Sequence, residues 1–168
     1  VICYGMGSTL DDVKNAAAAE KNIVCSSAAI KAAEYLKEKF GTPYEIEYPQ
    51  SCLPEEIVQK ADNFTDKNVL VIHNQTADDA VRKLITEKSG KCHCTSATFF
   101  MQKKELSQQS DFFLADESDL CDNVGDNYDV VIADKTLRRV MKNFSGEFID
   151  FPHFGLSGRL LQGESEKI

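Results

Sequence analysis

The sequence predicts an α/β protein with a three-layer architecture, in which helices cover both faces of a mostly parallel sheet. Short apolar runs alternate with amphipathic stretches along most of the 168 residues, as repeated strand–helix–strand units require. Two runs, Asn68–Ile72 and Tyr128–Ala133, are largely apolar, which is typical of central parallel strands covered on both faces. The composition, 42% hydrophobic and 27% charged, suits an ordinary globular core.

The first third of the chain shows three strand patterns and two helix patterns. The helix over Ser27–Phe40 is the clearest, since its apolar residues recur at helical spacing and Gly41 followed by Pro43 provides a stop signal. Ahead of it, Ser8 or Thr9 can cap a shorter helix. The strands expected in this part are Val1–Tyr4, Asn22–Cys25 and Tyr44–Tyr48.

The remainder of the chain repeats this alternation around the first of the two apolar runs. Pro54 opens a helix before that run, and Thr76 together with Asp79 is expected to cap the helix that follows it. Residues 101–124 are polar and irregular, with one short helix expected near Ser118–Val124. The other elements expected are strands at Lys91–Phe100, Tyr128–Ala133 and Glu147–Phe151, and a helix at Thr136–Met141.

These patterns divide the chain into two subregions, with the seam in the segment YPQSCLP. Residues 1–49 are expected to form the end of a preceding α/β domain, residues 50–154 an α/β domain with a parallel sheet, and residues 155–168 a loose C-terminal tail. Three strands are too few for a whole domain, so the first subregion is expected to pack against the remainder of its own subunit. Because Val1 lies inside an expected strand, we also expect further residues upstream.

Charge and hydropathy exclude several classes of partner. The formal net charge of −8 argues against nucleic acid and anionic membranes, because phosphate binding needs clustered Lys and Arg. No apolar run approaches the roughly 20 residues of a spanning helix, and the chain does not begin like a signal peptide, so a cytoplasmic protein is expected. The sequence also lacks a complete glycine-rich phosphate loop and a G-x-S-x-G motif, which disfavours nucleotide binding and hydrolase chemistry.

The six cysteines are expected to be free thiols. The chain is long enough for an ample core, and a reduced thiol on a packed strand is the common state in an intracellular protein. Cys92-His93-Cys94 resembles a fragment of a metal site, but no second pair lies at zinc-site spacing, so no zinc is assigned.

The residues just after the strands are the candidates for a binding site, because the ligand crevice of an open parallel sheet lies beyond the carboxyl ends of its strands. Cys25 stands there before a helix N-terminus, a setting that stabilises a thiolate and suits a metal ligand; a small buried strand residue is the alternative. His73 and His153 also follow strands; the alternative is a helix-capping or loop histidine for His73 and a structural histidine for His153. Ser26 and Asn74 complete the candidate cofactor-binding set.

Five segments, in order, resemble the nitrogenase component 1 family, which includes the molybdenum–iron protein subunits, their cofactor-assembly scaffolds and related tetrapyrrole reductases. The segments are GSTLDDVKNAAAAEKNIV, SAAIKAAEYLKEKFGTPY, NVLVIHNQTADDAVRKLI, YDVVIADKTLRRVMKNF and FIDFPHFGLSG. They span nearly the whole chain. The resemblance implies a Rossmann-like fold of the nitrogenase iron–molybdenum protein type, with this chain matching the end of the second of three α/β domains and the third domain.

The same resemblance implies a metallocluster, of the iron–sulfur or molybdenum–iron type, or a tetrapyrrole held between domains. Aligning back from KFGTPY places Cys25 at the cysteine that ligates the cofactor in the molybdenum–iron α-type subunits, whereas aligning forward from GSTLDDVK misses it by one residue. The family's histidine ligand lies in the closing loop, where His153 is the nearest candidate. Its spacing to the following Ser157-Gly158 is one residue shorter than in those subunits.

An oxidoreductase subunit is therefore the first hypothesis for the parent protein. It would receive electrons from a separate ATP-dependent iron–sulfur reductase and pair with a homologous partner subunit, as the resemblance implies. A cofactor-assembly scaffold without turnover is the closest alternative, and a two-lobed α/β ligand-binding module is an alternative of another class. The isolated segment is expected to fold without its cofactor and to be inactive, since a crevice that lacks most of its walls cannot exclude water.

Overall fold

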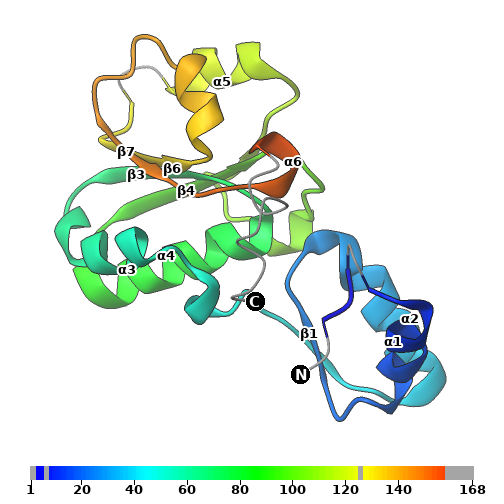
Figure 1. The fold of residues 1–168 in the computed structure, drawn as a ribbon. Helices are drawn as coiled ribbons and strands as arrows, with labels where there is room; N and C mark the ends of the chain where they lie inside the picture. The colour runs from blue at the N-terminus through cyan, green and yellow to red at the C-terminus, as the bar shows by residue number, and fades with distance from the viewer. Residues whose placement is uncertain (1–2, 6–7, 125–126, 158–168) are drawn as a thin grey trace.

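The computed structural model describes residues 3–5, 8–124 and 127–157 (Figure 1). These residues form a two-stranded sheet and a five-stranded sheet, and every strand pair in both sheets is parallel. The predicted α/β class is confirmed. The two sheets divide the chain on either side of Pro49, since the first uses strands before this residue and the second uses strands after it.

The first sheet pairs β1 (Asn22–Val24) with β2 (Tyr44–Ile46), and helix α2 (Ile30–Phe40) connects the two strands. A short 3₁₀ helix, η2 (Ser27–Ala29), leads into α2. Gly41 ends α2 at φ 75°, in the left-handed region that glycine adopts without strain. The core of this unit is small, because few apolar side chains from β1 and α2 are buried together. Its buried members are Val24, Ile30 and Ala33.

A capping box begins α1 (Leu10–Lys14), the first helix of the chain. The hydroxyl of Thr9 accepts a hydrogen bond from the backbone N–H of Asp12 at 3.2 Å, and the carboxylate of Asp12 accepts one from the N–H of Thr9 at 2.9 Å. These two bonds satisfy donors that a helix start leaves unpaired. The helix then tightens into η1 (Asn15–Ala18).

The second sheet has the strand order β5-β4-β3-β6-β7, so the first of its strands in sequence lies at its centre. Val71 of β3 lies opposite Ser96 of β4 on one side and Ile132 of β6 on the other. The strands are β3 (Asn68–Ile72), β4 (His93–Thr98), β5 (Phe112–Phe113), β6 (Val130–Ala133) and β7 (Glu147–Asp150). Their shared direction brings their carboxyl ends to one edge, where the candidate site lies.

Helices cover both faces of this sheet. Successive residues of β3 point to opposite faces, so Val69 and Val71 pack with α3 (Glu55–Lys60) and α4 (Gln75–Ser89), while Leu70 packs with the helices of the other face. The second face is covered by α5 (Glu117–Val124) and η6 (Lys135–Arg139) (Figure 1). The shorter remaining helices are η3 (Gln50–Cys52), η4 (Ala61–Phe64), η5 (Lys104–Leu106) and α6 (Phe154–Ser157).

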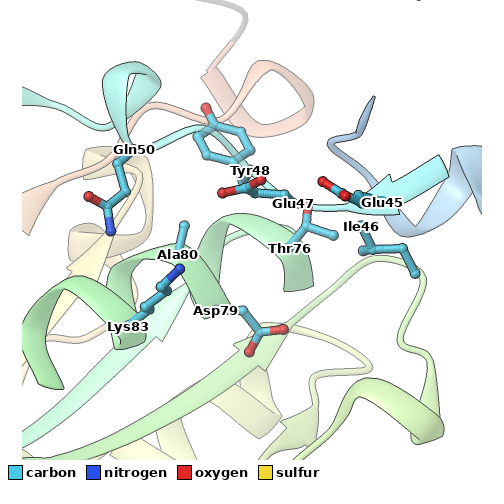
Figure 2. A pocket seen from close by; sticks show the side chains of 9 residues that line it. All are labelled: Glu45, Ile46, Glu47, Tyr48, Gln50, Thr76, Asp79, Ala80 and Lys83. Carbon is cyan, nitrogen blue, oxygen red and sulfur yellow. The ribbon is translucent and has the colours of Figure 1, made fainter. Parts of the chain in front are cut away.

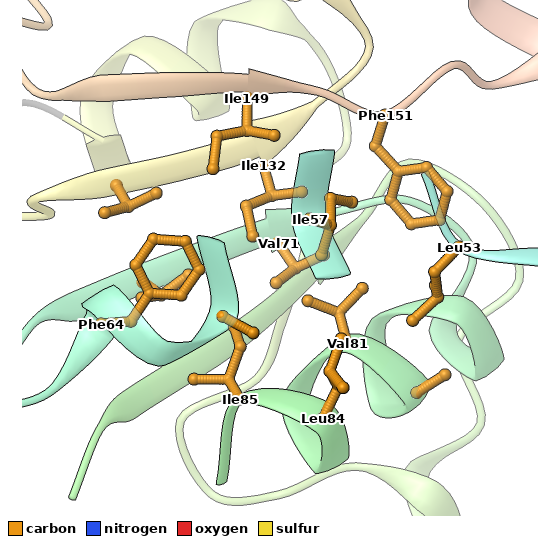
Figure 3. Close-up of a cluster of buried hydrophobic side chains, with 14 of the residues drawn as sticks. Leu53, Ile57, Phe64, Val71, Val81, Leu84, Ile85, Ile132, Ile149 and Phe151 are labelled. Carbon is orange, nitrogen blue, oxygen red and sulfur yellow. The ribbon is translucent and has the colours of Figure 1, made fainter. Parts of the chain in front are cut away.

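Figure 3 shows the larger of the two hydrophobic clusters that pack against the five-stranded sheet; it lies between the sheet and the layer of α3 and α4. Ile57 of α3 and Ile85 of α4 are completely buried against the strands. Burial of an aliphatic side chain of this size stabilises the fold by about 1.5–3 kcal/mol. The other labelled side chains of this cluster are Leu53, Phe64, Val71, Val81, Leu84, Ile132, Ile149 and Phe151.

Most of the elements predicted from the sequence are present, within two residues at their ends. The strand at Asn68–Ile72 agrees at both ends, and the helix predicted at Ser27–Phe40 is η2 followed by α2. The prediction of a strand at Val1–Tyr4 is wrong for its described part, since Cys3 and Tyr4 belong to no strand; residues 1–2 lie outside the described residues.

In the second subregion the structure differs from the sequence-based prediction in three details. The helix predicted at Thr136–Met141 is the 3₁₀ helix η6, and a short strand, β5, lies in the stretch predicted to be irregular. Residues 155–157 of the predicted loose tail belong to α6, whereas residues 158–168 lie outside the described part of the chain. Among the described residues, no helix is long and apolar enough to cross a membrane.

The start of α4 corrects another prediction, because Asn74 caps this helix instead of Thr76. The Oδ1 atom of Asn74 accepts a hydrogen bond from the N–H of Ala77 at 3.0 Å. The hydroxyl of Thr76 lies 2.6 Å from the same Oδ1 and 2.5 Å from the carbonyl oxygen of Cys25. A hydroxyl has one proton to donate, so Thr76 shares it between these two acceptors.

Candidate functional site

The carboxyl edge of the five-stranded sheet brings two of the predicted site residues into contact. His73 directly follows β3, and His153 follows β7 after two intervening residues. Their rings lie edge to face with centroids 4.5 Å apart. Asp134, directly after β6, accepts a hydrogen bond from the backbone N–H of His153 at 2.9 Å. Residues that follow β3, β6 and β7 thus lie together at this edge.

The imidazole of His73 is buried and neutral. Its Nε2 lies 3.1 Å from the carbonyl oxygen of Pro152, which can only accept, so Nε2 carries the proton. Its Nδ1 is buried and has no hydrogen-bond partner among the described residues. The ring stacks on Phe151 with centroids 4.0 Å apart. Burial, and then the neighbouring His153, lower the pKa of His73 to about 3.

His153 is enclosed by aromatic rings. It stacks between Phe100, at a centroid distance of 4.1 Å, and Phe154, at 5.0 Å, and only 2% of its surface is exposed. Its Nδ1 accepts a hydrogen bond from the N–H of Gly155 at 3.1 Å, so Nδ1 carries no proton in this arrangement. Burial lowers the pKa of His153 to about 4. Both candidate histidines are therefore neutral at pH 7.

Cys25 lies where the sequence places it, between the end of β1 and Ser26, the residue that caps η2. Its side chain is exposed. Stabilisation of its thiolate by the helix start would lower the pKa of Cys25, but the pKa is raised. Burial of part of the thiol raises the pKa of Cys25, followed by the proximity of Cys52, Cys3 and Glu47. The thiol is thus protonated in the absence of a metal.

Two hydrogen bonds fasten the Cys25 segment to the start of α4. The carbonyl oxygen of Cys25 accepts from Thr76, and the hydroxyl of Ser27 donates to Oε1 of Gln75 at 3.3 Å. Gln75 is itself buried and bonds the backbone of Lys103 through both ends of its amide. The backbone around Cys25 is therefore tied to the second subregion.

Ser26 and Asn74, the other two predicted cofactor-binding residues, both act as helix caps. Ser26 accepts from the N–H of Ala28 at 3.4 Å, a long bond, and Asn74 caps α4. Both side chains are partly exposed. The Oδ1 atom of Asn74 already accepts from Thr76 and Ala77, so its amide nitrogen is the group left for a ligand, whereas the hydroxyl of Ser26 can still donate its proton and accept one further bond.

A polar network on α4 was not foreseen from the sequence. Asp78 is completely buried, and one of its carboxylate oxygens accepts from the hydroxyl of Ser96 at 2.6 Å. Burial raises the pKa of Asp78 well above its usual value. Nearby, the guanidinium of Arg82 forms ion pairs with Asp111 at 2.5 Å and with Asp79 at 2.9 Å. These contacts join α4 to β4 and to the segment before β5. They were not predicted, because Asp79 was assigned to the cap of α4 together with Thr76.

A groove of about 410 Å³ lies between α4 and the segment formed by β2 and the residues after it (Figure 2). Glu47 and Tyr48 line it from the β2 side, and Asp79 and Lys83 line it from α4. Its two walls thus come from the two subregions. Among the described residues, no three His, Cys, Asp or Glu side chains form a group that could hold a single metal ion.

Comparisons with known proteins establish the fold alone. No family model matches the chain, and no curated protein matches it in sequence. A solved structure of nitrogenase Cp1 at pH 6.5 matches with a TM-score of 0.57 and 15% sequence identity, over 90% of this chain. The chain spans 43% of the length of that structure. The likeness confirms the predicted Rossmann-like α/β fold and supports a structural similarity to nitrogenase component 1.

Proposed function

We propose that this chain is a segment of an oxidoreductase subunit of the nitrogenase component 1 type, in which Cys25 ligates a metallocluster held between the two subregions. The position of Cys25 carries the proposal. Its thiol is exposed, it follows a strand, and its backbone is held by Thr76 of α4. A ligand to a cluster needs this combination of an open sulfur and a fixed backbone.

The residues present fit such a group in part. Cys25 fits, since a coordinating metal deprotonates a thiol outright and thereby overcomes its raised pKa. His153 fits poorly in the present arrangement, because its ring is enclosed and its Nδ1 accepts from Gly155. Ligation by His153 therefore requires the closing loop to move. A tetrapyrrole is the alternative occupant.

When bound, a metallocluster would supply electron transfer to a substrate. In this proposal Cys25 would bind the cluster, and the hydroxyl of the adjacent Ser26 would donate a hydrogen bond to it. The neutral rings of His73 and His153 would lie buried at the carboxyl edge of the sheet. In this proposal the electrons come from an ATP-dependent iron–sulfur reductase, and a homologous subunit supplies the missing walls. The fold-level likeness to a nitrogenase structure supports this assignment.

Anaerobic reconstitution of the complete subunit with ferrous iron and sulfide tests the proposal, because this segment alone lacks most walls of the crevice and is expected to fold without the cofactor. We expect the iron, the acid-labile sulfide and the visible charge-transfer band of the cluster at this crevice to be lost in Cys25→Ala. Cys121→Ala is the matched control, because Cys121 is also exposed but lies on α5, on the other face of the sheet. Equal iron content in wild type and Cys25→Ala would refute a ligand role. If iron does not bind but a porphyrin shifts its absorption with the wild type, the tetrapyrrole alternative is correct.

A further inference from the structure

We propose that the groove between β2 and α4 binds a small zwitterion, an amino acid or a short peptide, with Glu47 holding its ammonium group and Lys83 its carboxylate. This binding site is separate from the proposed cluster ligand. It uses the side chains that line the groove, and neither Cys25 nor the two histidines belongs to the lining. Thr76 of the lining bonds the carbonyl oxygen of Cys25, and Tyr48 contacts the ring of His73, so the groove adjoins the proposed cluster site.

The charges of the groove are already partly neutralised within the chain. The carboxylate of Glu45 forms an ion pair with Lys21 at 2.8 Å, and that of Asp79 forms one with Arg82 at 2.9 Å. These two carboxylates are engaged and can attract a further cation only weakly.

Two groove charges have no such partner. Within the described part of the chain, Glu47 and Lys83 take part in no salt bridge, and both side chains are exposed. The groove thus presents one carboxylate and one ammonium group that a ligand can pair with.

The two free charges lie on opposite walls. Glu47 belongs to the segment after β2, and Lys83 belongs to α4 (Figure 2). Gln50 also lines the groove, and the nitrogen of its amide is a neutral donor. A ligand between the walls therefore meets an acceptor on one wall and a cationic donor on the other.

The size and the lining narrow the class of ligand. A volume of about 410 Å³ lies at the small end of the range of roughly 300–1,000 Å³ typical of small-molecule sites. The lining also has an apolar part, from Ile46, Tyr48 and Ala80, that a hydrophobic side chain can contact. A wholly apolar ligand would leave Glu47 and Lys83 desolvated without partners, which is unfavourable. A polyphosphate would face three carboxylates in the lining and be repelled.

Isothermal titration calorimetry of the full chain tests this assignment. The probes are leucine, leucinamide, which lacks the carboxylate, and 4-methylpentanoic acid, which lacks the ammonium group, together with leucylleucine and 6-aminohexanoic acid as longer zwitterions. We expect at least one zwitterion to bind, and its singly charged analogues to bind about tenfold more weakly, as the loss of a charge-assisted hydrogen bond predicts. Failure of every zwitterion to bind at millimolar concentration, or equal binding of the singly charged analogues, would overturn the proposal.

Two variants locate the site. Glu47→Gln and Lys83→Gln should each weaken binding of the zwitterion about tenfold, and Glu47→Gln should also abolish the advantage of leucine over 4-methylpentanoic acid. Matched controls are Glu34→Gln and Lys31→Gln on α2, which change the same charges at exposed positions outside the groove. Equal weakening by the control substitutions would show only a general charge effect and would refute the groove.

Discussion

The imidazole rings of His73 and His153 meet edge to face at the carboxyl edge of the sheet, with centroids 4.5 Å apart and planes at 68°. Two neutral rings can share this buried space, whereas two imidazolium ions would repel each other in a medium of low polarity. The pair therefore couples the protonation of this edge to the stability of the fold.

Acidification should destabilise the protein through these two histidines. Their folded pKa values, about 3 and about 4, lie below the ordinary value of 6.5. Between pH 6.5 and pH 4 the unfolded chain binds more protons, so the free energy of unfolding falls as the pH falls. Each histidine contributes a slope of up to about 1.4 kcal/mol per pH unit. Urea denaturation at pH 7 and pH 5 measures the effect.

The variant His73→Asn should remove about half of this histidine-dependent slope. His93→Asn is the matched control, because His93 is exposed on β4 and belongs to no described ring contact. The comparison between variants is more informative than the slope of the wild type, since other buried groups titrate in the same window. An unchanged slope in His73→Asn would contradict the assignment.

Asp78 is predicted to act in the opposite direction. Its folded pKa is raised by burial, so its stabilising contribution is fully present below the unfolded value of 3.8 and is lost as the pH rises towards the folded pKa. Asp78→Asn keeps an oxygen for the hydroxyl of Ser96 and removes this titration. The variant should therefore gain stability relative to wild type as the pH rises from 4 to 7, as denaturation curves would measure. Asp122→Asn, at an exposed position on α5, should show no such trend.

The hydrogen bond from Thr76 to the carbonyl oxygen of Cys25 should stabilise the first subregion. Thr76→Val preserves the shape of the side chain and removes its hydroxyl, so we expect a loss of about 0.5–1.5 kcal/mol. Hydrogen–deuterium exchange should become faster in β1 and β2, with β3 unaffected.

Thr86→Val provides the comparison for this helix, because the hydroxyl of Thr86 bonds the carbonyl of Arg82 within α4 itself. Faster exchange of β1 in both variants would mean that α4 is generally weakened, and the link to Cys25 would not be the cause.

Truncation of a buried side chain in the large core should cost more stability than truncation of the exposed Ile23 in the first sheet. Ile85 is completely buried, so Ile85→Ala is expected to cost about 2–5 kcal/mol in unfolding free energy. Ile23 of β1 is 43% exposed, and Ile23→Ala should cost less than about 1 kcal/mol. Thermal and urea denaturation of the two variants compare them directly. Similar losses would indicate that β1 is more deeply buried than the structure shows.

Local sequence was sufficient for most of the fold. The central strand Asn68–Ile72 and the helix that Gly41 ends follow from apolar periodicity and a stop signal, which neighbouring residues determine. The strand β5 was missed because it has two residues and depends on pairing with β4, and the cap of α4 was misassigned because Thr76 bonds a distant carbonyl. Contacts between segments far apart in sequence leave no local pattern.

The candidate site was predictable to a lesser degree. The rule that ligands bind beyond the carboxyl ends of parallel strands selected His73 and His153, and they do meet. Their burial could not be foreseen, because it depends on Phe151, which follows β7 and stacks on His73, and on Phe100, which follows β4 and stacks on His153. The raised pKa of Cys25 likewise reflects its surroundings in three dimensions.

The strand order of the second sheet also constrains how the chain is made. Since β3 lies between β4 and β6, it cannot gain its second neighbour until the chain as far as Ala133 has emerged from the ribosome. Parallel neighbours form no hairpins, so each pairing must wait for a crossover. One edge of β3 therefore remains unpaired during synthesis until β6 has been translated. The nascent chain is expected to rely on chaperones during that interval.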